Sequence, residues 1–187
     1  MRGRRLFNDE KERRKWQNPE AILVDIGVRP GIIFVDLGCS DGFFALHAAR
    51  LVGEEGRVLG LDADPEAIRR LRQRALKENL INLKVETGMA EERFLCDSCA
   101  DLVFLGIVLH DFIDPRRVLS NAKMMLKPTS RLVDLDWKKE PMQLGPPLKI
   151  RFDENKASEL IKSAGFEIGE IKKQGAYQYL ILATPKP

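Results

Sequence analysis

The chain has 187 residues, of which 44% are hydrophobic and 32% are charged, and its formal net charge is +3. This balance fits one ordinary globular domain with a sizeable core, and so small a charge does not by itself indicate nucleic acid. No apolar run is long enough to span a bilayer, and the first fifteen residues include no apolar leader. We therefore expect no membrane partner and a cytoplasmic location, where the three cysteines would stay reduced.

Residues 1–17 form a mixed-charge arm that precedes one predicted domain over residues 18–187. Its composition predicts a solvated, partly helical segment. The alternative is a lid on the substrate side, because Phe7 and Trp16 supply apolar anchors. Asn18, directly before a proline, predicts the start of the first helix of the domain.

A buried strand is predicted over Ile32–Asp36, and it leads into a turn that contains Gly38 and Gly42. An apolar helix follows from Phe43. Strand, glycine turn and helix open many nucleotide-binding α/β units, where the glycines admit a ligand and the helix offers free N–H groups to an anion. The alternative is that the two glycines only shape a tight turn.

The second predicted strand, Arg57–Asp62, ends in an acid about twenty residues beyond the glycine turn. A carboxylate at that strand tip can accept two hydrogen bonds from a ribose diol. Asp64 stands before a proline and is expected to cap the next helix, which leaves Asp62 for a ligand.

Further along, Cys96 and Cys99 form one isolated Cys-x-x-Cys pair. A structural zinc site needs four ligands, so we expect no metal and two ordinary loop cysteines before a strand. His110 follows that strand. It is a candidate general base near physiological pH, or a packing or hydrogen-bonded histidine.

The last third of the chain begins with Leu126-Lys127-Pro128 and a strand that ends near Trp137. The segment Lys138–Lys149 is long and rich in proline and lysine, which indicates either a lid with Trp137 and Met142 against an apolar substrate or a stiff surface bend. One helix and two strands, Phe166–Lys173 and Tyr177–Thr184, complete the chain.

Three features together, Asp36-x-Gly38-x-Ser40-x-Gly42, Asp62 and Leu126-Lys127-Pro128, resemble the class I S-adenosylmethionine-dependent methyltransferases over about residues 18–184. The layout is similar to that of small free-standing enzymes that methylate small molecules, such as those of quinone biosynthesis. The resemblance implies a three-layer, Rossmann-like α/β fold with a seven-stranded, mostly parallel sheet whose last strand is antiparallel. Ser40 replaces the middle glycine of the family motif, a mild departure if Ser40 keeps a negative φ.

The resemblance also implies S-adenosyl-L-methionine as the cofactor and a small molecule as the methyl acceptor. Met89 stands where the family commonly has an acid that reads adenine, and Leu105 lies near the expected sulfonium. The family members that methylate adenine or glutamine nitrogen carry an Asn/Asp-Pro-Pro motif after the fourth strand, which this chain lacks. The implied cofactor contacts are Asp36, Gly38, Ser40, Gly42, Asp62, Ala63, Met89, Ala90 and Leu105.

Two alternatives of other classes stay open. Basic residues at Arg2, Arg4 and Arg5, with the Lys138–Lys149 segment, would suit an RNA methyltransferase or RNA-binding module. Ser40 and Met89 depart from the family and would suit a non-catalytic scaffold that retains the fold. A nicotinamide dehydrogenase is disfavoured by the glycine spacing. The sequence leaves the acceptor and the oligomeric state open.

Overall fold

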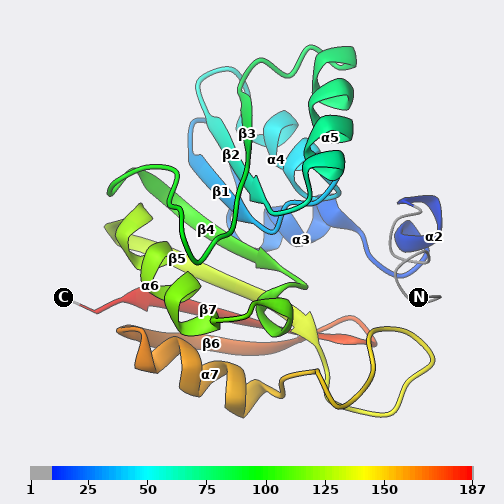
Figure 1. Cartoon of the computed structure of the whole chain (residues 1–187), viewed down its shortest axis with the longest axis vertical. Helices are drawn as coiled ribbons and strands as arrows, with labels where there is room; N and C mark the ends of the chain where they lie inside the picture. The colour runs from blue at the N-terminus through cyan, green and yellow to red at the C-terminus, as the bar shows by residue number, and fades with distance from the viewer. Residues whose placement is uncertain (1–9, 187) are drawn as a thin grey trace.

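The computed structural model describes residues 10–186, and its centre is one seven-stranded sheet in the order β3-β2-β1-β4-β5-β7-β6 (Figure 1). Strands β1 to β5 run parallel, whereas β7 is antiparallel to both of its neighbours, β5 and β6. The predicted sheet and its antiparallel last strand are confirmed. The strands are β1 (Ile33–Leu37), β2 (Arg57–Asp62), β3 (Leu83–Thr87), β4 (Ala100–Gly106), β5 (Leu126–Trp137), β6 (Phe166–Gln174) and β7 (Gln178–Pro185).

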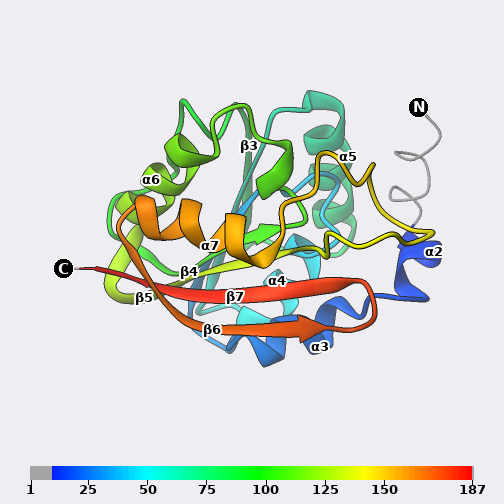
Figure 2. The ribbon, with the colours of Figure 1, turned by 90° about the horizontal axis from the view of Figure 1, so that it is seen from below.

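Helices cover both faces of the sheet and complete the three layers (Figure 2). The apolar stripes of α3, α4 and α5 pack on one face, and those of α6 and α7 pack on the other. None of the helices within residues 10–186 is long and apolar enough to cross a membrane. The helices are α2 (Glu10–Arg14), α3 (Pro19–Asp25), α4 (Ala45–Val52), α5 (Pro65–Lys77), the 3₁₀ turn η1 (Leu109–Asp111), α6 (Pro115–Met125) and α7 (Glu154–Ser163).

Side-chain caps explain where four of these helices begin. Asn18, Asp64, Asp114 and Asp153 each accept a main-chain N–H from the first turn of the helix that follows. Each cap satisfies a donor that the helix itself leaves unpaired. The predicted caps at Asn18 and Asp64 are therefore confirmed, and the second of these frees Asp62 from capping α5.

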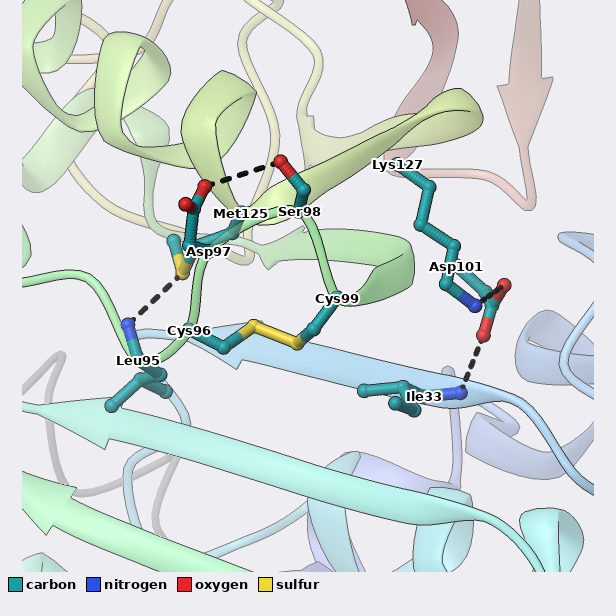
Figure 3. The surroundings of a disulfide bond; sticks show 9 residues. All are labelled: Ile33, Leu95, Cys96, Asp97, Ser98, Cys99, Asp101, Met125 and Lys127. Atoms are coloured by element: carbon teal, nitrogen blue, oxygen red, sulfur yellow. Dashed lines mark hydrogen bonds and ion pairs between the residues drawn. A yellow bond between two sulfur atoms is a disulfide. The ribbon is translucent and has the colours of Figure 1, made fainter.

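The connection from β3 to β4 is a loop that spans residues 88–99 and contains a disulfide between Cys96 and Cys99 (Figure 3). The expectation of two unpaired loop cysteines is therefore wrong. The two cysteines lie only three positions apart. Hydrogen bonds to the end of α6 hold the loop on either side of Cys96: the Leu95 N–H donates to the sulfur of Met125, and the Ser98 N–H donates to the carbonyl of Met124.

A cavity of about 320 Å³ lies beside this disulfide, at the amino ends of β1, β2 and β3. Ile33, Arg57 and Lys84, each first or second in its strand, line it together with the two cysteines. The glycine turn and the predicted ribose carboxylate lie at the opposite, carboxyl ends of these strands. The cavity is therefore separate from the candidate site described next.

Candidate cofactor and acceptor site

The glycine turn leaves β1 with three residues in the left-handed region: φ is +81° at Gly38, +49° at Ser40 and +95° at Gly42. The condition of a negative φ at Ser40 is not met, because this serine holds a conformation that favours glycine. A Cβ at Gly38 would lie 2.6 Å from a methyl carbon of Val108. This glycine is thus required by close packing against the segment after β4, as well as by its backbone angle.

Asp62 joins the glycine turn to the tip of β2. One carboxylate oxygen accepts the N–H of Ser40 at 2.8 Å, and the other accepts the N–H of Asp64 at 2.8 Å. These bonds fix the orientation of the carboxylate, and each oxygen keeps a second lone pair. Asp62 is therefore oriented at the predicted place and can accept hydrogen bonds from two neighbouring hydroxyl groups.

Asp36, at the end of β1, is buried, with 2% of its surface exposed. Burial raises the pKa of its carboxyl from 3.8 to about 7; the nearby charge of Asp62 adds to the rise, and Arg13 opposes it. The carboxyl therefore titrates near neutral pH. It supplies a group beside the turn whose charge depends on what binds there.

Arg13, in the amino-terminal arm, is a site residue that sequence reasoning missed. Its guanidinium lies 3.8 Å from the centre of the Phe43 ring, and its Nε donates to Gln17 at 2.6 Å. Its Nη2 is buried and has no hydrogen-bond partner among residues 10–186. Burial lowers the pKa of Arg13 to about 9, although Asp36 and Asp41 oppose the change. A buried, unpaired cationic donor beside the glycine turn suits an anionic group of a ligand.

The arm reaches this place because several contacts hold it over the carboxyl edge of the sheet. Glu10 forms an ion pair with Arg74 of α5. At the other end of the arm, Trp16 packs against Trp137 with ring centres 5.2 Å apart, and the Gln17 amide donates to Gln178 at 2.8 Å. These contacts favour the lid rather than the solvated arm for this segment. Phe7, one of the two expected apolar anchors, lies outside the described residues.

The predicted adenine segment follows β3 at the same edge. The Gly88 N–H donates to the carbonyl of Asp62 at 2.9 Å, and the Asn121 amide donates to the carbonyl of Ala90 at 2.7 Å. Met89 is half-buried between these anchors, and Ala63 is exposed beyond the tip of β2. The structure therefore brings the β1, β2 and β3 segments to one edge of the sheet.

Leu105 takes a different position from the one that its predicted role suggests. Its side chain is fully buried in the core beneath α6. Only its main chain is available to a ligand. Two residues later, Ile107 has φ +65°, a strained angle for a β-branched side chain, while its N–H donates to the Leu135 carbonyl at 2.7 Å. Strained backbone thus lies next to the glycine turn.

His110, in η1, is buried and paired with Asp136 at the end of β5. Its Nδ1 lies 2.8 Å from a carboxylate oxygen of Asp136. Burial alone would lower the pKa of His110, but the hydrogen bond and charge of Asp136 outweigh it and raise that pKa above 6.5. The histidine is therefore hydrogen-bonded, and its raised pKa suits a proton acceptor.

Two further polar side chains lie beside this pair, and their polar atoms have no hydrogen-bond partner: Asp134 of β5 and Tyr179 of β7. Burial and the charge of Asp136 raise the pKa of Asp134 well above its ordinary value. Burial and the two aspartates raise the pKa of Tyr179 as well.

The segment between β5 and α7 is organised by Arg151. Its guanidinium donates to the carbonyls of Lys138, Glu140, Leu144 and Pro146 at 2.8 to 3.2 Å. Lys138 is itself buried, and its ammonium donates to the carbonyl of Ala176 in the β6–β7 turn at 2.9 Å. The predicted lid segment is therefore an ordered loop; Met142 is half-buried within it.

Residues 29–165 match the methyltransferase domain family. The crystal structure of an S-adenosylmethionine-dependent methyltransferase from Aquifex aeolicus superposes with a TM-score of 0.85 and 28% identity, over 89% of this chain and 88% of that one. The fold is that of a class I methyltransferase.

The chain belongs to this methyltransferase domain family, whose cofactor is S-adenosylmethionine. Among curated relatives, an arsenite methyltransferase of Halobacterium salinarum is 29% identical over 64% of this chain and 30% of its own length. The ubiquinone/menaquinone biosynthesis C-methyltransferase of Yersinia pestis is 28% identical over 84% of this chain and 60% of its own length. The chain therefore spans less than two thirds of the curated relatives that it matches.

The residues present fit this cofactor. Asp62 offers oriented acceptor lone pairs for a diol, and Arg13 offers a buried donor that lacks a partner. Both flank a turn in which glycine at position 38 leaves no Cβ. S-adenosylmethionine carries a ribose diol and a carboxylate, so its polar groups complement these two side chains.

Proposed function

We propose that the protein transfers the methyl group of S-adenosylmethionine to a small-molecule acceptor. The observation that carries the proposal is the carboxylate of Asp62, which is held between the Ser40 and Asp64 amides at the tip of β2. A hydrogen-bond acceptor fixed beside a glycine turn is the arrangement that a ribose diol requires. The bound cofactor supplies an activated methyl group, so the protein mainly has to orient the reactants and exclude water.

In this proposal each part of the site has a task. Asp62 and Ala63 adjoin the ribose, and the main chain from Gly38 to Gly42 adjoins the methionine end. Arg13 donates its unpaired Nη2 hydrogens to the carboxylate of that end. Asp36 supports the turn from below. The adenine lies against Met89 and Ala90, where a thioether can pack on the ring face.

The acceptor is proposed to enter where the segment after β4 meets the ends of β5 and β7. The curated relatives named above act on arsenite and, by name, in ubiquinone/menaquinone biosynthesis, both of which favour a small acceptor. The division into a charged arm over residues 1–17 and one domain over residues 18–187, with residues 10–17 as a lid, remains part of this proposal. A cytoplasmic location is also part of it.

RNA as the acceptor has less support from the described residues. Lys138, the first residue of the basic segment, has its ammonium turned to the carbonyls of Gly175 and Ala176. Arg151, two residues after that segment, donates its hydrogen bonds to four loop carbonyls. Neither cation is available to a phosphate backbone. Arg2, Arg4 and Arg5 lie outside the described residues.

The test is to incubate the full chain with S-adenosylmethionine labelled in the methyl group and with an extract separated into small molecules, RNA and protein. The proposal expects label in the small-molecule fraction, and expects Asp62→Asn to abolish it at low cofactor concentration. Label in RNA alone would favour the RNA methyltransferase. No transfer together with no cofactor binding would favour the scaffold.

A further inference from the structure

We propose that His110 accepts a proton from a weakly acidic hydroxyl group, a phenol or an enol, on the methyl acceptor, and that Asp136 positions its imidazole. This inference rests on the proposed methyltransferase function and narrows the acceptor to one chemical class. It follows from the geometry of two side chains that lie 26 residues apart in sequence and meet at the ends of β4 and β5.

The hydrogen bond between the two side chains fixes which nitrogen is free. The Nδ1 of His110 lies 2.8 Å from each oxygen of the Asp136 carboxylate, and one of these oxygens also accepts the N–H of Trp137 at 2.7 Å. A carboxylate accepts and does not donate, so Nδ1 carries the hydrogen. The lone pair of the neutral ring is therefore on Nε2.

The free nitrogen faces the outer side of the site. Nε2 lies 3.5 Å from a carboxylate oxygen of Asp111, whose side chain is 58% exposed, while the His110 side chain is 2% exposed. The ring is thus buried, with its Nδ1 edge on Asp136 and its Nε2 edge beside the exposed carboxylate of Asp111. Val108, two residues earlier, packs against Gly38, so η1 directly adjoins the glycine turn. An acceptor atom near the methyl donor would lie within this neighbourhood.

Three charged groups face the ring from the elements around it. Asp136 of β5 and Asp111 of η1 favour the protonated form, whereas Arg151, from the loop before α7, disfavours it. Asp134, two residues before Asp136 on the same face of β5, is buried, and its pKa is raised well above its ordinary value. The ring therefore keeps a basic Nε2, stronger than that of an isolated histidine, as a proton acceptor should be.

A base of this strength is useful only for an acceptor that still carries its proton at neutral pH. The hydroxyl proton passes to Nε2 while an electron pair of the acceptor forms the new bond to the methyl carbon, and the carbon–sulfur bond breaks toward sulfur. The imidazolium then releases the proton to solvent, so charge and atoms balance. Soft nucleophiles that attack through a lone pair and lose no proton, such as thioethers, need no such group, which favours the phenol or enol.

The first test needs no acceptor, because the chain has only two histidines. Imidazole resonances of the full chain are titrated by NMR, and the His110 signal is the one missing in His110→Gln. We expect a pKa above 6.5 in the wild type and a lower pKa in Asp136→Asn. An unchanged pKa in Asp136→Asn would overturn the positioning role.

The second test uses probe acceptors with labelled cofactor: catechol and 1-naphthol as hydroxyl compounds, and dimethyl sulfide and dimethyl selenide as soft nucleophiles that lose no proton. We expect methylation of a hydroxyl probe that rises with pH through the His110 pKa and falls about 10²- to 10⁴-fold in His110→Gln. Asp136→Asn should shift the pH profile in the direction of the NMR pKa.

The outcomes separate this inference from the proposed function. Methylation of the soft probes alone, or of neither hydroxyl probe, would overturn the acceptor class. So would a His110→Gln variant with an unchanged rate and pH profile. Binding of S-adenosylmethionine, measured by calorimetry, should be the same in wild type and His110→Gln. Loss of binding in the wild type would instead contradict the methyltransferase function itself.

Discussion

Arg13 places its guanidinium carbon 3.8 Å from the centre of the Phe43 ring, at the start of the helix that follows the glycine turn. Since Nη2 of Arg13 is buried without a partner, the unliganded protein carries an unsatisfied donor there. Such a donor destabilises a fold by about 1 to 3 kcal/mol until something accepts its hydrogen bond.

Replacing this side chain should therefore weaken cofactor binding without lowering the free energy of unfolding. In Arg13→Met we expect affinity for S-adenosylmethionine to fall about tenfold or more, because a charge-assisted hydrogen bond is lost. The free energy of unfolding should change little, since loss of the Gln17 bond is offset by removal of the orphan donor. Calorimetry and urea unfolding measure the two quantities. The control is Arg14→Met, whose side chain pairs with Glu20 at 3.0 Å; an equal loss of affinity there would contradict the assignment.

Asp36 should make stability depend on pH. Its pKa rises from 3.8 to about 7 on folding, so the folded state binds the proton more tightly than the unfolded state. The stability from this carboxyl is complete below about pH 4 and is lost as pH rises through about 7. Relative to Asp36→Asn, which stays neutral, the wild type should lose roughly 3 kcal/mol between about pH 5 and pH 8.5. Parallel unfolding curves for both proteins across this range would show that the carboxyl does not titrate there.

Replacing Ser40 by glycine should stabilise the protein. Its φ of +49° is costly for a residue with a Cβ, and its contact with Asp62 uses the main-chain N–H, which glycine keeps. We expect Ser40→Gly to raise the free energy of unfolding by about 1 kcal/mol. Ser98, with φ +46° in the disulfide loop, gives a matched control, Ser98→Gly, remote from the site. If Ser40→Gly alone lowers stability, the serine hydroxyl contributes more than the strain costs.

The disulfide should affect stability and leave the cofactor alone. Cys96 and Cys99 close a ring of four residues, for which the chain-entropy relation gives about 2 kcal/mol. Cys96→Ser with Cys99→Ser should therefore lower the melting temperature by several degrees. Affinity for the cofactor should not change, because the adenine segment is held separately by Asn121. A thiol count on the denatured, unreduced wild type should find one free cysteine, Cys39. Three thiols would show that the pair is reduced.

Local chemistry explains what could be predicted from the sequence. Caps at Asn18 and Asp64 depend on one side chain and the next few amides, and strands depend on short apolar runs, so both are readable in the chain. Asp62 was predictable because the second strand ends beside the first turn in any parallel sheet of this order.

Long-range contacts explain what was missed. Arg13 is one of several cations in the arm. Which of them is buried depends on the contacts of Trp16 with Trp137 of β5 and of Gln17 with Gln178 of β7. The partner of His110 depends on the register between β4 and β5, which brings Asp136 beside η1. The angle at Ser40 depends on the hydrogen bond of its amide to Asp62. None of these is encoded by a local pattern.

The most direct test of the central claim is thermal unfolding with and without S-adenosylmethionine, for the wild type, Asp62→Asn and Asp64→Asn, with NADH as the ligand control. Asparagine retains a helix cap at position 64 but removes the charge from the proposed ribose contact at position 62. Ligand at about a hundred times its dissociation constant should stabilise the wild type by about 2.7 kcal/mol, or about 5 to 10 °C. The account predicts this shift in the wild type and Asp64→Asn, a much smaller shift in Asp62→Asn, and none with NADH. No shift in the wild type, or an equal shift in Asp62→Asn, would contradict it.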